Sequence, residues 1–317
     1  MNHPAFDFAQ LRLWAELVCA PLNQYALCEL PFRTQIAVFD WLRHKRWHDF
    51  INEPNMKPLE ATSLAEFVKA VEKLVREWTP DGADWYLQPW FRGHGNVSWS
   101  LEPGWYRPSN PAQGIGADYY SEATLLEKFK LRAPTYLERL PANDWEWVFL
   151  MQHYGLPTRL LDWTESSLIA LYFAIRDNAG DADAAVWVMN PWWLNHQTFD
   201  DYVLFAADDP RAAGHAPLRP GEKLKGQLPL AITPIHGSQR IAAQRGVFTL
   251  HGTERGALDR LASSRKTEGA YLRPIIIPKA NIFTVHQDLA ISGISESLIF
   301  PELSGLCREI KTGFFGD

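Results

Sequence analysis

The chain has 317 residues, with 37 acidic side chains against 31 basic ones and a formal net charge of −6. Hydrophobic residues make up 46% and charged residues 21%, which is ordinary globular usage and excludes disordered and fibrous classes. No apolar run approaches the ~20 residues of a membrane span, and the acidic balance argues against constitutive coating of nucleic acid. The three cysteines form neither a metal-binding spacing nor a disulfide framework. We therefore expect a cytoplasmic protein with no membrane segment and no metal site.

The first 80 residues have a helical pattern. Ser63 with Glu66 three positions later predicts a capping box at the start of a helix that ends near Thr79. The whole chain is therefore expected to divide into a helical N-terminal extension over residues 1–62 and a main domain over residues 63–317.

Short strands and two helices are predicted next. The aromatic segment Trp85–Arg92 predicts a strand that enters a tight loop at Gly93, and Val97–Arg107 predicts a second short strand. Ser121 is placed to cap a helix, and Trp145–Tyr154 predicts another.

The segment after residue 160 predicts a further helix. Asp162 and Glu165 have the spacing of a cap and its N3 partner, and an apolar face follows over residues 168–175. Residues 184–189 predict a buried strand. Residues 191–237 lose periodicity and are interpreted as a long irregular insertion, a kind of segment that is usually functional or mobile.

The last part of the chain predicts two more strands, over residues 240–251 and 271–277, around a short polar helix, with two closing helices over residues 280–311. The strands are too irregularly spaced for a doubly wound sheet. The predicted fold class is α+β, with a mixed or antiparallel sheet as its core.

Arg92 is the first candidate for a binding residue. A guanidinium where a strand meets a glycine loop can bind a phosphate bidentately, while Gly93 lets backbone N–H groups approach the ligand. The alternative for Arg92 is a buried ion pair with Asp162 or Glu122.

Three further side chains carry two interpretations each. His94 and His153 stand beside glycines, and each either bonds a ribose hydroxyl or acts as a general base, or else bonds loop carbonyls. Asp162 is either an N-cap or a carboxylate that stabilises a developing cation or orients Arg92. Glu122, Glu127 and Glu296 are further candidates for the catalytic carboxylate, and the sequence does not choose among the four. Arg159 is expected to face a different direction from Asp162.

Four segments together resemble the FRG domain family, named for a Phe-Arg-Gly triplet. They are FRGHGNVSWSLEPGWYR (91–107), LMQHYGLPTRLLDWTESSLIALYFA (150–174), RIAAQRGVFTLHG (240–252) and SESLIFPELSGL (295–306). The resemblance covers roughly residues 63–310.

A more distant resemblance is to ADP-ribosyltransferases, whose NAD site begins with an aromatic-Arg-Gly at a strand end. It implies a fold like theirs, with NAD as the substrate. Arg92 would be the first element, Thr158 or Thr164 the second, and the strand at Gln244 the third, where Gln replaces the Glu of that family. The candidate catalytic residues are Arg92, Asp162, Gln244 and His153. The candidate NAD-binding residues are Arg92, Gly93, His94, Thr158, Arg159 and Thr164.

The resemblance implies an NAD-dependent ADP-ribosyltransferase-like enzyme that modifies a nucleic acid or a protein. It further implies a toxin or phage-defence effector with a neutralising partner, such as an antitoxin or regulatory protein. Gln244 favours the alternative, a non-catalytic module that senses a nucleotide or binds a partner. On the transferase hypothesis, Arg92, Gln244 and one of Thr158 or Thr164 should converge on one cleft lined by Trp or Tyr, with His94 and His153 at its rim.

Overall fold

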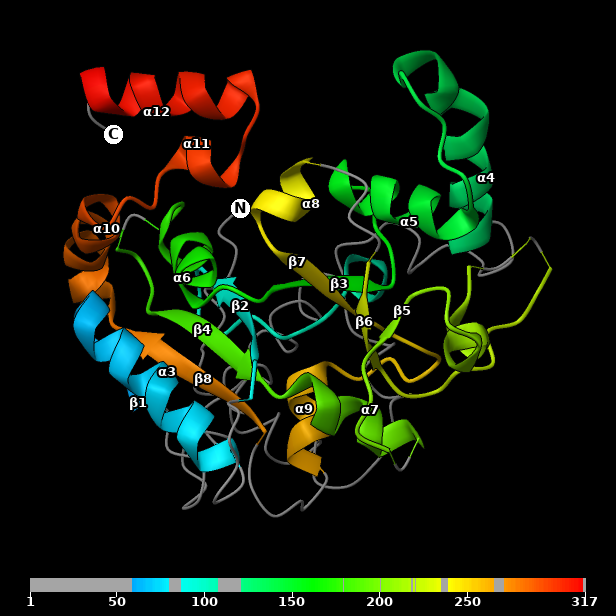
Figure 1. Ribbon diagram of the computed structural model, residues 1–317, viewed down its shortest axis with the longest axis horizontal. Helices are drawn as coiled ribbons and strands as arrows, with labels where there is room; N and C mark the ends of the chain where they lie inside the picture. Colours follow the sequence, from blue (N-terminus) through cyan, green and yellow to red (C-terminus); the bar gives the residue numbers. More distant parts are fainter. Residues whose placement is uncertain are drawn as a thin grey trace, which may run out of the picture. The chain divides into compact units, whose positions relative to one another are not determined.

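The protein is described by a computed structural model that covers residues 59–79, 87–107, 121–178, 180–199, 201–217, 219, 221–234, 239–264 and 271–315. All but the last four residues of the predicted helical extension over residues 1–62 lie outside this part of the chain. Helices and strands alternate irregularly around one mixed sheet (Figure 1), as the α+β prediction requires. None of the described helices is long and apolar enough to cross a membrane.

The sheet has eight strands in the order β1-β8-β4-β2-β3-β7-β6-β5. All inner neighbours are antiparallel, and only the outermost pairs β1–β8 and β5–β6 are parallel. In sequence order the strands are β1 (Leu59–Glu60), β2 (Trp90–His94), β3 (Leu160–Thr164), β4 (Ala184–Met189), β5 (Phe205–Ala206), β6 (Leu230–Thr233), β7 (Gly246–Leu250) and β8 (Leu272–Ile277).

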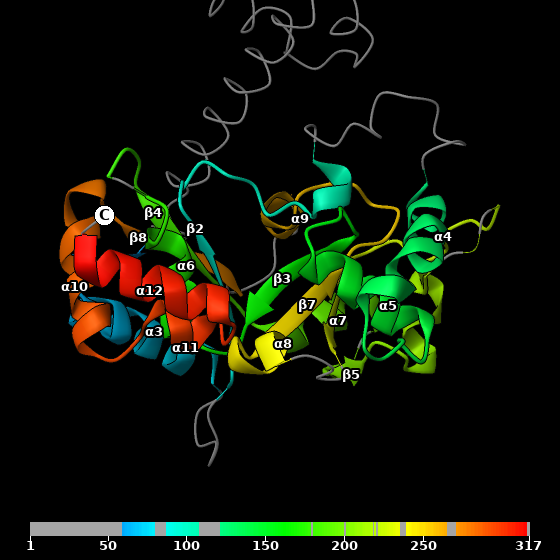
Figure 2. The same ribbon diagram turned by 90° about the horizontal axis from the view of Figure 1, so that it is seen from above.

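The sheet is split between its fourth and fifth strands. Strands β2 and β3 share a single residue pair, Phe91 with Thr164. By contrast, β2 pairs with β4 over the whole of Trp90–His94, and β3 pairs with β7 over the whole of Leu160–Thr164. Figure 2 shows β2 and β3 meeting at one end and diverging from there. The sheet therefore consists of two halves of four strands each, joined at one point.

The first half, β1-β8-β4-β2, is covered by α3 (Leu64–Trp78), α6 (Ser167–Ile175) and α10 (Ile282–Ile291). Inward side chains of β4 and β8 are fully buried against these helices in one hydrophobic cluster. Strand β4 is buried at every position because it is central and covered on both faces.

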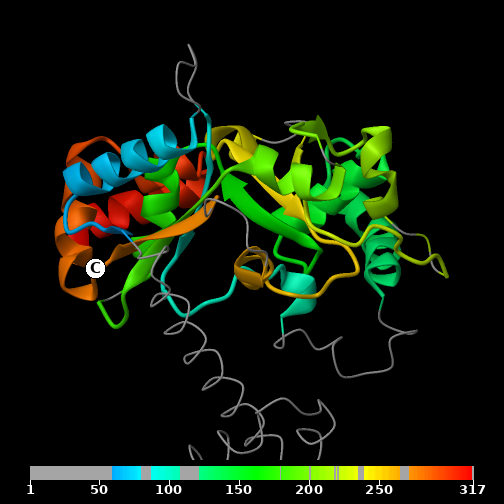
Figure 3. The same ribbon diagram turned by 90° about the horizontal axis from the view of Figure 1, so that it is seen from below.

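The second half, β3-β7-β6-β5, has a separate hydrophobic cluster with α4 (Glu122–Arg132) and α5 (Asp144–His153). Helix α7 (Pro191–Phe199) also packs on this half, through Asn195, whose amide pairs with the backbone of Ala231 on β6. Figure 3 shows α3 (blue) and α10 (orange) gathered over one half and α4 (blue-green) over the other.

Four more helices complete the described part of the chain. They are α8 (Gln239–Ala243), α9 (Leu258–Ser264), α11 (Glu296–Ile299) and α12 (Leu303–Phe315), with 3-10 turns at Gly104–Tyr106, Ala133–Tyr136, Pro210–His215 and Lys279–Asn281.

The predicted helix starts at Ser63 and Ser121 are confirmed. Ser63 Oγ accepts from the Glu66 N–H at 3.3 Å, while the Glu66 carboxylate reaches back to the Thr62 N–H at 2.8 Å. Ser121 Oγ accepts from the Thr124 N–H at 3.0 Å. Both helices begin where a side-chain acceptor satisfies an otherwise unpaired amide.

Four sequence-based assignments are wrong. Asp162 is not a helix cap: it lies in the middle of β3, and Ser166 caps α6. The predicted strand over residues 97–107 is an irregular segment with a 3-10 turn, because proline and glycine at 103 and 104 leave no room for a ladder. Residues 191–237, which were expected to be irregular, contain α7, β5 and β6. Residues 240–251, which were expected to be a strand, begin in helix α8 and only then form β7.

Candidate functional site

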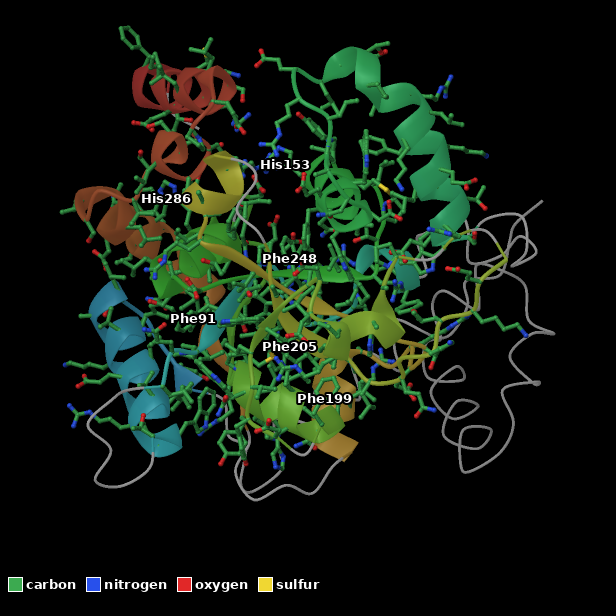
Figure 4. All side chains as sticks on the ribbon, turned by 45° about the vertical axis from the view of Figure 1, so that its right-hand side comes forward. Phe91, His153, Phe199, Phe205, Phe248 and His286 are labelled. Carbon is green, nitrogen blue, oxygen red and sulfur yellow. The ribbon has the colours of Figure 1, made fainter. Side chains whose placement is uncertain are left out.

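A cavity of about 410 Å³ lies at the split between the two half-sheets. It is bounded by β2, β3 and β7 and by helices α5, α6 and α8. Figure 4 labels three of the lining side chains, Phe91, His153 and Phe248. The lining residues are Phe91, Arg92, Gly93, Phe149, Gln152, His153, Gly155, Asp162, Trp163, Thr164, Ala170, Phe173, Arg240, Ile241, Gln244, Gly246 and Phe248.

The apolar walls are mainly phenylalanine. Phe149 and Phe248 stack with ring centroids 5.1 Å apart, and Phe91 and Phe173 come from β2 and α6. Among the described residues of the lining, Trp163 is the single tryptophan and there is no tyrosine. The cavity therefore offers flat apolar surface for a ring, although it comes from phenylalanine rather than the expected Trp and Tyr.

Arg92 spans the split from β2 to β3. Its Nη1 donates to the backbone oxygen of Asp162 at 2.6 Å and lies 3.8 Å from that residue's carboxylate, and its Nε donates to His94 Nε2 at 3.1 Å. Burial, together with the charge of Arg107, lowers the pKa of Arg92 to about 10, against the opposing effect of Asp162. Arg92 therefore stays charged at neutral pH. Its Nη2 forms no hydrogen bond to the described residues, and Arg92 lines the cavity, so this nitrogen is available to a ligand.

His94 accepts a hydrogen bond from Arg92 and is not among the residues that line the cavity. Because Nε2 accepts from Arg92, the ring carries its proton on Nδ1 and is neutral. Burial, followed by the charges of Arg92 and Arg107, lowers the pKa of His94 well below its usual range. The expected rim position is wrong for His94, whose role in this geometry is to orient the guanidinium.

Gly93 has a packing reason to be glycine. A Cβ at this position would collide with the backbone of Ala170 and Ala174 on α6. The close approach of α6 to β2 therefore depends on the glycine of the triplet, whereas the sequence suggested an opening for a ligand.

Asp162 is held by a chain of hydrogen bonds. The Leu160 N–H donates to Thr158 Oγ1 at 3.1 Å, Thr158 donates to Gln152 Oε1 at 2.6 Å, and Gln152 Nε2 donates to Asp162 Oδ2 at 2.7 Å. The carboxylate side chain remains 56% exposed. Asp162 is thus an oriented carboxyl group that lines the cavity beside Arg92. Gln152 was missed from the sequence, because only the fold brings α5 beside β3.

Thr164 and Gln244 meet at the end of β3. Thr164 Oγ1 donates to the backbone oxygen of Gln244 at 2.7 Å and accepts from the Ser166 N–H at 3.0 Å. The Gln244 side chain donates to the backbone oxygen of Ile299 at 3.3 Å. Both residues line the cavity, and their bonds tie the start of β7 to α6 and α11.

His153 stands at the end of α5, half-buried in the lining of the cavity. Burial lowers its pKa, and so does the charge of Arg240, while Glu302 and Asp162 raise it. At neutral pH the ring is therefore neutral and able to accept a proton. Arg240 itself lines the cavity, and sequence reasoning missed it because it was assigned to a strand.

Arg159 lies immediately before β3 and is buried. It forms a 2.5 Å ion pair with Glu122 and donates to the backbone oxygens of His251 and His215 at 2.9 and 3.0 Å. The expectation that it faces away from Asp162 is met. Because its donors are taken up by protein groups, Arg159 is not placed to bind a ligand in this cavity.

The structure thus gathers most of the sequence candidates around one cavity. The candidates in the lining are Arg92, Gly93, His153, Asp162, Thr164 and Gln244, and those outside it are His94, Thr158 and Arg159.

Fold and site define an α+β protein with a split sheet and a partly buried arginine–carboxylate pair at the split. Residues 88–183 match the model of the FRG domain family, so the chain contains an FRG domain. The matched segment runs from the residue pair before β2 to the residue before β4, and it contains Arg92, His153 and Asp162. No curated protein and no solved structure matches the chain, so the likeness to ADP-ribosyltransferases is not confirmed.

Proposed function

We propose that the cavity binds NAD and that the protein transfers its ADP-ribosyl group to a macromolecule. The observation that carries the proposal is the pairing of Arg92 with Asp162 at 3.8 Å in an aromatic cavity. A cation and an oriented carboxylate at this spacing suit a substrate that has an anionic phosphate and develops positive charge on a sugar carbon. The convergence of Arg92, Thr164 and Gln244, in the chain order that the resemblance implies, supports the same reading.

Each group has a role in the proposed reaction. Asp162 stabilises positive charge on the ribose carbon as the bond to nicotinamide breaks, and nicotinamide leaves with the bonding electron pair. Arg92 Nη2 binds a phosphate oxygen, and the phenylalanine walls contact the flat rings. Gln152 orients the carboxylate, because its side-chain amide donates to Asp162 Oδ2.

The acceptor must lose a proton when its nucleophilic atom bonds to the ribose carbon. His153 is neutral because burial lowers its pKa, and it lines the cavity, so it takes this proton. The cavity volume of about 410 Å³ lies within the ~300–1,000 Å³ of typical small-molecule sites.

A second candidate function is nucleotide sensing without chemistry. Its support is Gln244, which stands where the resemblance expects a glutamate and whose amide is bonded to the backbone of Ile299. In this version Arg92 and the aromatic walls bind the nucleotide, and no acceptor is modified.

Labelled NAD separates the two functions. The protein is incubated with ³²P-NAD and a cell lysate, and the label is followed into protein and nucleic acid fractions beside nicotinamide release. Asp162→Asn removes the charge with little change of shape, and Asp162 has no capping role to lose. We expect Asp162→Asn to transfer the label at least about 10²-fold more slowly than the wild type, as when other groups that stabilise transition-state charge are removed. Its melting temperature should be unchanged.

The matched control is Asp177→Asn, which alters an 83% exposed carboxylate outside the cavity lining and should leave transfer intact. Binding of NAD without any transfer or nicotinamide release by the wild type would replace the transferase with the sensor. Equal transfer by wild type and Asp162→Asn would remove Asp162 from the reaction.

A further inference from the structure

Three arginines surround the ring of the buried residue Phe300. The guanidinium carbons of Arg240, Arg176 and Arg308 lie 4.6, 4.8 and 5.3 Å from the ring centroid. Phe300 follows α11 and also contacts Phe173 of the cavity wall edge-on, with centroids 5.8 Å apart. The ring is thus a fixed platform that connects the cavity wall to the guanidinium groups.

The three arginines differ in their counter-charges. Arg176 and Arg308 both pair with Glu296, at 3.5 and 2.6 Å. Arg240 has no carboxylate within ion-pair distance among the described residues, and it is the one of the three that lines the cavity. The Phe300 ring therefore supports the Arg240 guanidinium beside the cavity, and the positive charge of Arg240 is not neutralised by a carboxylate of the described residues.

Arg240 and Arg92 approach the cavity from different elements, α8 and β2. Among the described residues, the lining contains these two cations and one carboxylate, Asp162, while His153 is neutral. A partly enclosed site with excess positive charge is costly unless a ligand supplies anions. Two separate guanidinium groups fit two separate anionic groups.

We propose that Arg92 and Arg240 form a clamp for a diphosphate, with each guanidinium binding one phosphate group. The clamp deepens the proposed function, on which it rests, because NAD carries a diphosphate between its two nucleoside halves. It makes the cavity selective for nucleoside diphosphate groups over nucleoside monophosphates. Arg240 is held in advance by Phe300, so little side-chain freedom is lost on binding.

The clamp is tested by calorimetric titration of the full chain with ADP and with AMP, which differ by one phosphate. Arg240→Gln should weaken ADP binding about tenfold or more, the effect of losing a charge-assisted hydrogen bond. The affinity for AMP should change less than about threefold, because AMP has no second phosphate for Arg240 to bind. Arg240→Lys should retain part of the preference for ADP, because the charge stays but the planar fork is lost.

The matched control is Arg308→Gln, which removes a guanidinium from the same ring but outside the cavity lining, and it should change neither affinity. Thermal melting of each variant shows that it folds.

Equal loss of ADP and AMP affinity, or no loss, in folded Arg240→Gln overturns the clamp, as does a wild type that binds ADP no better than AMP. These results differ from failure of the proposed function. A protein whose ADP preference depends on Arg240 but which never consumes NAD keeps the clamp and loses the transferase. A protein that transfers ADP-ribose but whose ADP affinity does not depend on Arg240 keeps the transferase and loses the clamp.

Discussion

The two half-sheets differ in how the hydrogen-bond donors of their arginines are used. In the second half, Arg159 is buried and its charge is matched by Glu122, with backbone oxygens accepting from its remaining nitrogens. At the edge of the first half, Arg92 crosses the split, uses Nε and Nη1 for His94 and Asp162, and keeps Nη2 for the cavity. A satisfied arginine holds structure together, whereas one that keeps a donor beside a cavity is suited to a ligand.

The difference follows from strand pairing. Because β2 and β3 share one residue pair, the backbone oxygen of Asp162 is available to the Arg92 guanidinium, and the diverging strands leave space beside it. Arg159 precedes β3 and is buried, and α4 supplies Glu122 as its partner. Removing the charge partner of Arg159 should therefore lower the stability of the fold, whereas replacing Arg92 should weaken ligand binding.

The largest expected effect is on the buried pair. Glu122→Ala leaves the Arg159 guanidinium buried without its carboxylate, which should lower the free energy of unfolding by about 3–5 kcal/mol. Urea denaturation of the full chain measures this change. Glu127→Ala, at an exposed position on the same helix, is the control and should change stability by less than about 0.5 kcal/mol. Similar midpoints for the two variants would show that Arg159 is not a structural anchor.

The glycine of the triplet gives a smaller expected effect. Gly93→Ala places a methyl group against the backbone of α6, and overpacking of this kind costs about 1–3 kcal/mol. Gly95→Ala is the control, because its Cβ would meet only ordinary contacts at 3.7 Å and beyond. Thermal unfolding of both variants is the measurement. Equal melting temperatures would mean that α6 and β2 are not held in contact by Gly93.

Local signals made much of the fold predictable. Ser63 and Ser121 cap helices because the cap, the first turn and the apolar face lie close together in sequence. The run of β-favouring residues over 184–189 similarly predicts a buried strand. Asp162 was misassigned because its cap spacing is a local pattern, and pairing with Phe248 of β7, far along the chain, prevails over it.

The site was predictable in part. Arg92 and His153 belong to motif segments, and the resemblance groups Arg92 with Gln244. The difference between Arg92 and Arg159 was not accessible, because it depends on Glu122, which lies 37 residues before Arg159. Arg240 was missed for the same kind of reason: its orientation depends on Phe300 of a distant segment.

The most direct measurement of the central claim is the NAD affinity of Arg92→Lys, by calorimetry beside the wild type. Lysine keeps the positive charge but cannot bond His94 and Asp162 while also presenting a third nitrogen to a phosphate. We predict at least about tenfold weaker binding, in a protein that still unfolds cooperatively. An Arg92→Lys protein that binds NAD as tightly as the wild type would contradict the account, because the ligand would then be bound without the group that the split sheet presents.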